Sequence, residues 1–206
     1  MIQKFDASAA LLLIDVQKGV NDTAYYGGAI GERNNLDAEK NILSILSEWR
    51  GSDRQVAFTK HNSREKNSPL KLSLESGQQL EGMEPMGADI VVEKDVNSGF
   101  IGTSLEIDLR RAGIQRLVVV GFFTNFCIET TVRMAGNMGF DTYLVHDACA
   151  TMDLVGHDGK NYNADLVHNV AIASLHGEFC TAISTKDVLH LCSENAEFLN
   201  RVQGNE

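Results

Sequence analysis

The sequence predicts an α/β fold, a single-domain, doubly wound (Rossmann-like) six-stranded parallel sheet with helices on both faces. Short apolar runs alternate with amphipathic stretches along the 206 residues, and this alternation is typical of βαβ units. The inner runs are continuously apolar, as in strands that are covered on both faces. Two prolines, no repeat and no Pro-rich linker indicate one domain over residues 1–206.

Local patterns justify each element in turn. The first apolar run ends at Asp15, the run 117–121 is the clearest buried strand, and Gly51 ends the first helix. We expect strands at 11–14, 56–59, 89–93, 117–121, 142–145 and 181–184. Helices are expected at 37–50, 103–112, 125–138, 164–175 and from 186 onward. The polar segments 17–35 and 60–87, the second with a short helix, are expected to be functional loops that determine specificity.

Composition excludes several classes of partner. The net charge of −10 repels phosphate backbones and anionic lipids, so we expect neither nucleic acid nor a membrane as partner. The apolar run at 7–14 is far shorter than the roughly 20 residues of a membrane span. Four cysteines without a CxxC pair indicate reduced thiols and a cytoplasmic protein.

Three residues of different chemistry are expected at one edge of the sheet, where doubly wound folds bind ligands. Asp15 and Lys94 directly follow strands, and Cys127 lies at a helix start six residues after Gly121. A carboxylate that takes the thiol proton, with an ammonium and a helix start that favour the thiolate, suits covalent catalysis. Each residue also has an ordinary alternative: a turn-capping carboxylate, a solvated lysine or an inert core thiol.

The order of these motifs resembles the isochorismatase-like family of cysteine hydrolases, from residue 8 to about 189. The resemblance is carried by 10–17 (ALLLIDVQ), by Lys94 with Ser98, Phe100, Thr103 and Leu105, by 121–127 (GFFTNFC) and by 147–148 (DA). It implies that Asp15, Lys94 and Cys127 are catalytic. It also implies a cis peptide between Phe122 and Phe123, and an oxyanion hole formed by the backbone amides of Phe123 and Cys127.

Departures from the family's branches narrow the expected chemistry. The nicotinamidase branch binds a metal through Asp-x-His and a further His, whereas 60–63 reads KHNS, so we expect no metal and no cofactor. His61 lies either in the pocket or on the surface, and His168 and His176 are expected to be structural. The branch that cleaves the vinyl ether of isochorismate lacks the thiol, so Cys127 favours C–N hydrolysis.

The leading hypothesis is hydrolysis of a small amide, imide or carbamoyl compound through a thioester on Cys127. The alternatives are vinyl-ether hydrolysis and a non-catalytic binder or redox-sensing thiol protein. No Gly-x-Gly-x-x-Gly follows the first strand, which argues against a dinucleotide site. Tyr25, His61, Phe100 and Phe126 are candidate pocket residues, with ordinary packing or a subunit interface as the alternative for the aromatic ones. We expect a homo-oligomer, a dimer or tetramer.

Overall fold

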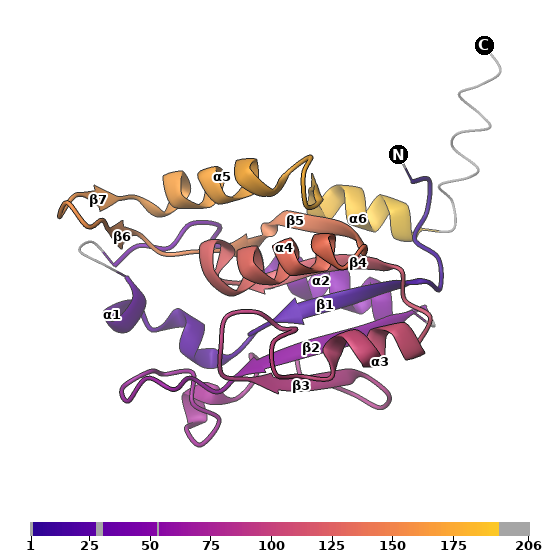
Figure 1. Cartoon of the computed structure of the whole chain (residues 1–206), viewed down its shortest axis with the longest axis horizontal. Helices are drawn as coiled ribbons and strands as arrows, with labels where there is room; N and C mark the ends of the chain where they lie inside the picture. The colour runs from indigo at the N-terminus through magenta and orange to yellow at the C-terminus, as the bar shows by residue number, and fades with distance from the viewer. Residues whose placement is uncertain (1, 28–30, 53, 194–206) are drawn as a thin grey trace, which may run out of the picture.

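The computed structural model describes residues 2–27, 31–52 and 54–193, and its centre is a six-stranded parallel sheet. The order across the sheet is β3-β2-β1-β4-β5-β8 (Figure 1). The strands are β1 (Ala9–Ile14), β2 (Gln55–His61), β3 (Ile90–Lys94), β4 (Arg116–Phe122), β5 (Asp141–Ala150) and β8 (Thr181–Ile183). The predicted fold class is therefore confirmed. The expected domain bounds of 1–206 include residues 1, 28–30, 53 and 194–206, which lie outside the described residues.

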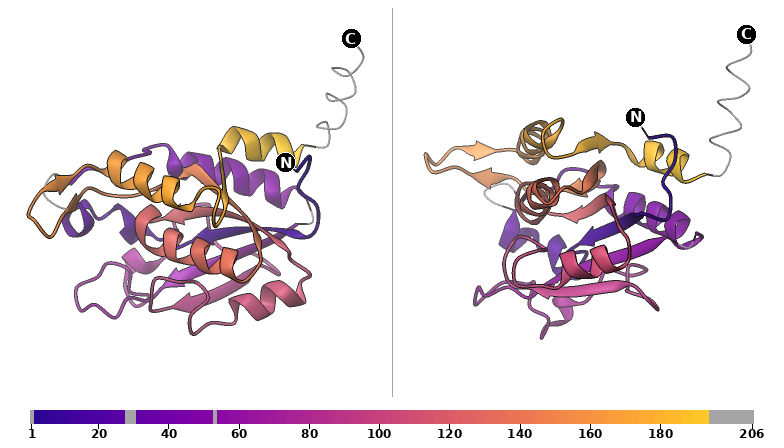
Figure 2. Two further views of the ribbon diagram at one scale, coloured as in Figure 1. Left: turned by 45° about the horizontal axis from the view of Figure 1, so that its top comes forward. Right: turned by 45° about the vertical axis from the view of Figure 1, so that its right-hand side comes forward.

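Helices cover both faces of the sheet, because the central strands are apolar on both faces. Every residue of β1 is buried, which agrees with its unbroken apolar sequence. Helices α2 and α6 lie on one face, and α3, α4 and α5 on the other (Figures 1 and 2). The bounds are α2 (Ala38–Arg50), α3 (Leu105–Arg111), α4 (Glu129–Asn137), α5 (Ala164–Leu175) and α6 (Thr185–Cys192). None of the helices in the described part of the chain has both the length and the apolar character needed to cross a bilayer.

Several short elements differ from the sequence expectation. Strand β5 continues to Ala150, well beyond the expected 142–145, and is followed by an antiparallel hairpin that the sequence did not suggest. A π-helical turn, η3, precedes α4 where one continuous helix was expected. The short elements are η1 (Lys18–Asn21), α1 (Thr23–Tyr26), η2 (Glu75–Gly77), η3 (Thr124–Ile128), β6 (Leu154–Val155) and β7 (Asn161–Tyr162). Of these, η2 agrees with the short helix expected within 60–87, whereas the others have too little periodicity to be recognised in a sequence.

A glycine allows β1 and β4 to approach closely at the functional edge. Gly121 has φ 126° and pairs with Ile14 in the β1/β4 register. A Cβ atom at this position would lie 2.1 Å from the carbonyl oxygen of Ile14, so no larger residue fits without moving a strand. The segment after β4 consequently begins directly beside Asp15.

Candidate active site

Neighbouring strands bring the candidate residues together at the carboxyl edge of the sheet. Asp15 follows β1, and His61 and Lys94 end β2 and β3, where they are partners in the β2/β3 register. Cys127 lies in η3, just after β4, which is the strand on the other side of β1. Because the four strands are adjacent and parallel, their ends meet at one place in the molecule.

Asp15 is a buried carboxylate with a partner at each oxygen. Its Oδ2 accepts a hydrogen bond from Lys94 Nζ at 2.5 Å, and its Oδ1 accepts one from Thr59 Oγ1 at 2.6 Å. The backbone of Asp15 is in the left-handed region, with φ 51°, which non-glycine residues rarely adopt. The chain thus leaves β1 with the carboxylate fixed by the end of the neighbouring strand.

Lys94 supplies a buried cation at the centre of the cluster. Its side chain is 0% exposed, and Nζ lies 2.5 Å from Asp15 Oδ2, 2.9 Å from His61 Nδ1 and 3.3 Å from Cys127 Sγ. Burial alone would lower the pKa of Lys94, but the charge of Asp15 and the contact with Cys127 raise it above its usual value. The ammonium therefore stays charged and has three nearby acceptors for its three N–H groups.

Cys127 lies against this ion pair with its thiol protonated. Burial raises the pKa of the thiol, and the negative charge of Asp15 raises it further, against the opposing effect of Lys94. Lys94 lowers the pKa of the thiol, as expected, but burial and Asp15 outweigh this effect, because burial disfavours any charged form. A base must therefore take the proton, and Asp15 has a carboxylate oxygen within 4.8 Å of the sulfur.

His61 lies inside the site, so the surface alternative is wrong. Its Nδ1 is 2.9 Å from Lys94 Nζ and 3.9 Å from Cys127 Sγ. Burial, together with the charge of Lys94, lowers the pKa of His61, so the ring is neutral at pH 7 and accepts through Nδ1. The side chain of Gln17 holds this strand end: the His61 N–H donates to Gln17 Oε1 at 2.7 Å, and Gln17 Nε2 donates to the His61 carbonyl at 3.1 Å.

The same cluster tests whether a metal fits. Asp15, His61 and Cys127 each offer a ligand atom, and the three atoms lie within 4.8 Å of one another. Lys94 Nζ is within hydrogen-bond range of all three. A cation bound by these atoms would have to displace the ammonium, so the donor set as arranged does not fit a resident metal.

A cavity of about 440 Å³ opens above Cys127. It is lined by Tyr25, Tyr26, His61, Ser63, Glu65, Ser68, Leu70, Asn97, Phe123, Phe126, Cys127 and Leu154. Three of the four expected pocket residues, Tyr25, His61 and Phe126, are therefore wall residues. Phe100 is corrected: its ring stacks on Phe140 with centroids 6.0 Å apart and packs into the core behind the site.

The loop between β4 and Cys127 has an unusual backbone. The peptide bond between Phe122 and Phe123 is cis. The Phe123 carbonyl accepts hydrogen bonds from the backbone amides of Phe126 at 3.0 Å and Ile128 at 3.2 Å. These bonds anchor the π-helical turn that carries Cys127 to the end of β4.

Some wall and support residues were missed in the sequence. Thr59 orients Asp15 from the β2 position that pairs with Ile14, and the expected sheet order could have identified it. Asn97 Oδ1 lies 3.8 Å from Cys127 Sγ, three residues after Lys94 in a polar loop with no sequence signal. Leu154 comes from the unexpected hairpin and had no signal either, whereas Glu65 lies in the loop 60–87, which was expected to determine specificity.

This fold and edge cluster define an α/β protein with a buried acid, ammonium and thiol beneath a cavity. A family model for the isochorismatase domain matches residues 9–187. The chain belongs to the isochorismatase family and is a hydrolase of the isochorismatase-like type.

Individual relatives support the same family. The uncharacterized isochorismatase family protein YrdC of Bacillus subtilis is 39% identical over 88% of this chain and 94% of its own. A crystal structure of an isochorismatase-family protein from Chromobacterium violaceum has a TM-score of 0.84 and 36% identity, covering 92% of this chain and 96% of its own. Nicotinamidase 3 of Arabidopsis thaliana is 29% identical over 75% of this chain and 79% of its own. The ureidoacrylate amidohydrolase RutB of Acinetobacter baylyi is 40% identical over 34% and 29%.

Proposed function

We propose that the protein hydrolyses a C–N bond of a small amide, imide or carbamoyl compound through a thioester on Cys127. The observation that carries this proposal is the set of contacts of Lys94 Nζ, 2.5 Å from the Asp15 carboxylate and 3.3 Å from the Cys127 thiol at the base of the cavity. A thiol, a base and a cation that lie in contact with one another match the requirements of nucleophilic catalysis. The amidohydrolases named among the relatives support the same chemistry.

Acylation begins with a proton transfer. Asp15 takes the proton of the Cys127 thiol as the sulfur attacks the carbonyl carbon, and a C–S bond forms while the carbonyl electron pair moves to oxygen. The adjacent Lys94 ammonium stabilises the negative charge that develops on sulfur as the proton leaves. The backbone amides of Phe123 and Cys127 are our proposed donors to the oxyanion.

The amine then leaves with the proton held by Asp15. The tetrahedral intermediate re-forms its C=O bond, the C–N bond breaks, and the leaving nitrogen receives that proton. Water attacks the resulting thioester and Asp15 accepts a proton from the water; the C–S bond then breaks, the sulfur takes that proton from Asp15, and the acid product is released. His61, neutral and hydrogen-bonded to Lys94, keeps the ammonium in place through this cycle.

Two variants on one active substrate test this proposal. A panel of amides is screened for ammonia release by the full-length protein, and the best substrate is used for Cys127→Ala and Asp15→Asn. We expect each to lower kcat by about 10³-fold or more, because each removes a covalent or proton-transfer partner. Cys149→Ala is the matched control, and we expect it to keep most of the activity.

The other outcomes identify the competing functions. A large loss of kcat in Asp15→Asn together with a nearly unchanged kcat in Cys127→Ala contradicts the thioester route. This result indicates vinyl-ether hydrolysis, in which the carboxylate protonates the substrate. If no amide is turned over and the protein binds small molecules equally well in both variants, the chain is a binding module.

A cytoplasmic location is proposed because the four cysteines are free, buried thiols.

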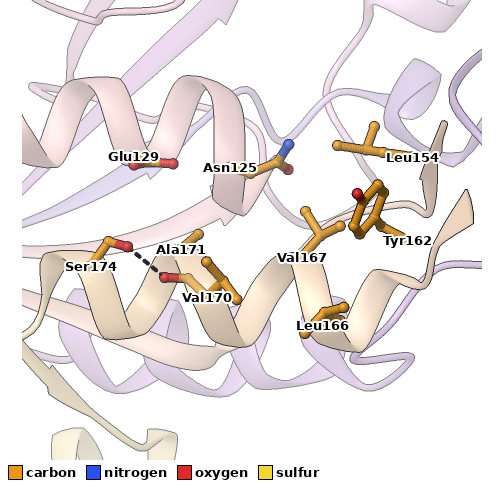
Figure 3. Close-up of a pocket in the computed structure, with 9 residues that line it drawn as sticks. All are labelled: Asn125, Glu129, Leu154, Tyr162, Leu166, Val167, Val170, Ala171 and Ser174. Carbon is orange, nitrogen blue, oxygen red and sulfur yellow. Dashed lines mark hydrogen bonds between the residues drawn. The ribbon is translucent and has the colours of Figure 1, made fainter. Parts of the chain in front are cut away.

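We also propose that the chain forms a homo-oligomer through the groove along α5 (Figure 3). This cavity of about 390 Å³ is lined by Asn125, Glu129, Leu154, Tyr162, Leu166, Val167, Val170, Ala171 and Ser174. Among the described residues that line it, Glu129 is the acidic one, and its Oε1 lies 2.6 Å from Arg133 Nη2. A chain of net charge −10 repels its own copies, so a groove whose described carboxylate is paired suits a second copy.

Light scattering at micromolar protein tests the oligomer. We expect a mass that is a multiple of the 22.6 kDa chain, and a shift toward the monomer for Val170→Asp, which places a charge on a side chain that is 56% exposed in the groove. Ile107→Asp is the control, because Ile107 is equally exposed, at 55%, on α3. A wild-type mass near one chain contradicts the proposal.

A further inference from the structure

The cavity above Cys127 has one acidic residue, Glu65, among its described wall residues. Of the described residues that line it, only Glu65 has a carboxylate, and none has an ammonium or guanidinium group. His61 is uncharged at neutral pH because burial and Lys94 lower its pKa. The walls thus carry net negative charge.

Three cations near the cavity, Lys94, Arg64 and Lys71, each have a partner. The Lys94 side chain is 0% exposed, and its charge is balanced by Asp15. Arg64 Nε lies 2.7 Å from Asp95 Oδ2, and Lys71 Nζ donates to the Ser63 carbonyl at 2.9 Å. Neither Arg64 nor Lys71 lines the cavity, so a substrate carboxylate would meet no cationic side chain among the described wall residues.

Glu65 is held at the cavity by aromatic residues that lead to the catalytic loop. The Tyr25 hydroxyl donates to Glu65 Oε2, and this hydrogen bond raises the pKa of Tyr25. The ring of Tyr25 packs edge-on against Tyr26 at 4.7 Å, and Tyr26 packs on Phe123 at 4.7 Å. The carboxylate therefore has a defined position relative to the loop that carries the nucleophile.

We propose that the cavity takes uncharged or cationic amides and rejects carboxylate-bearing ones, with Glu65 as the specificity-determining residue. This inference rests on the proposed function of Cys127. A carboxylate that entered would lose hydration without gaining a cation and would meet like charge at Glu65. The remaining walls, Leu70, Phe126 and Leu154 among them, suit an apolar body beside the amide group.

Thiol labelling measures this charge preference without any turnover. Three methanethiosulfonates are used, with an uncharged methyl, a cationic trimethylammonioethyl or an anionic sulfonatoethyl group. In each reaction the Cys127 thiolate attacks the reagent's sulfenyl sulfur, a mixed disulfide forms and methanesulfinate leaves. Rates at Cys127 are followed by peptide mass spectrometry on the full-length protein and divided by the rate of each reagent with 2-mercaptoethanol.

We expect the normalised rate of the cationic reagent to exceed that of the anionic reagent by about tenfold or more. Glu65→Gln should lower this ratio by about threefold to tenfold, since one charge near the path is removed, and Glu65→Lys should lower it further. High salt should compress the wild-type ratio. Glu75→Gln changes the net charge equally on a side chain that is 89% exposed and outside the cavity, so it should leave the ratio unchanged.

Each remaining outcome overturns the proposal. Equal or faster labelling by the anionic reagent contradicts the charge preference. An equal effect of Glu65→Gln and Glu75→Gln on the rate ratio would show that the preference comes from the net charge of the whole molecule. If the uncharged reagent fails to modify Cys127, the cavity does not lead to the thiol. Failure of the proposed function is separate, because amides could then remain uncleaved while the labelling ratio still responds to Glu65.

Discussion

Two polar clusters, each with a buried cysteine and a buried histidine, lie near the carboxyl ends of neighbouring strands of the sheet. Around Cys127 and His61 the partners are ionic, Asp15 and Lys94, and a cavity reaches the thiol. The second cluster joins Cys149 and His168 through neutral partners. Asn35 Nδ2 donates to the Cys149 carbonyl at 2.7 Å and lies 3.5 Å from His168 Nε2.

The comparison separates burial from reactivity. Burial raises the pKa of both thiols, Cys127 and Cys149, and lowers the pKa of both histidines. What differs is the ion pair and the access route, because Cys149 is 0% exposed and its thiol contacts a backbone carbonyl, that of Val119, at 4.0 Å. A buried thiol thus becomes a candidate nucleophile through its charged neighbours and an open cavity.

The largest effect is expected from Lys94→Met, which removes the cation of the first cluster. Asp15 then remains buried without its partner, so we expect a loss of about 3–5 kcal/mol in the free energy of unfolding and of about 10³-fold in kcat. Urea unfolding and amide hydrolysis measure the two effects. Cys149→Ala in the neutral cluster should cost only about 1–2 kcal/mol and keep activity.

The double variant Asp15→Asn with Lys94→Met sharpens the same comparison. Removing both charges should restore most of the stability, because no uncompensated charge stays buried, while activity remains lost. If the double variant is as unstable as Lys94→Met alone, the ion pair is not the source of the destabilisation.

Labelling with limiting iodoacetamide at neutral pH should modify Cys127 first, on the order of 100-fold faster than Cys149, because it combines a base, a cation and a cavity. Peptide mapping measures the order of modification. Cys180 and Cys192, with pKa values raised by burial to about 12 and about 11, serve as internal references. Earlier labelling of any of these three would show that the cluster around Cys127 does not activate its thiol.

The neutral cluster should make the free energy of unfolding depend on pH in the acidic range. Burial, with a smaller contribution from His146, lowers the pKa of His168 to about 4. Between about pH 6.5 and about pH 4 the unfolded chain binds a proton at this residue and the folded chain does not, so the free energy of unfolding falls as the pH is lowered. We expect about 1–2 kcal/mol, less than the full shift because of solvent screening.

Urea unfolding at pH 7 and pH 4.5 measures this loss. His168→Gln should reduce the change in the free energy of unfolding between these two pH values. His176→Gln changes an exposed histidine and should leave this change as it is in the wild type. An identical slope in all three proteins would exclude His168 as the origin.

The smallest effect is expected from chelators. Lys94 Nζ lies among the atoms of Asp15, His61 and Cys127 that could bind an ion, so treatment with EDTA or phenanthroline should change amide hydrolysis less than twofold. Loss of turnover that zinc or iron restores would instead show that a metal displaces the ammonium.

The sequence predicts the framework of this molecule better than the details of its site. Continuous apolar runs identified the six strands, and the position after each run brought Asp15, Lys94 and Cys127 together. The direction of the Cys127 pKa shift was not predictable, because burial of the thiol arises from long-range packing. The inward position of His61 depends on β2 continuing to this residue and on Gln17, which comes from a distant loop. Phe100 lies near motif residues in sequence but packs away from the cavity.

The strand order β3-β2-β1-β4 has a consequence for how activity arises during folding. Parallel neighbours cannot form as local hairpins and require long crossovers, and contacts between distant residues form slowly. The catalytic cluster contains residues as far apart in sequence as Asp15 and Cys127. The cluster can form only after β1 has paired with both β2 and β4. The rate at which hydrolysis recovers after dilution from denaturant therefore reports the pairing of the central strands. The helical circular dichroism signal can recover earlier.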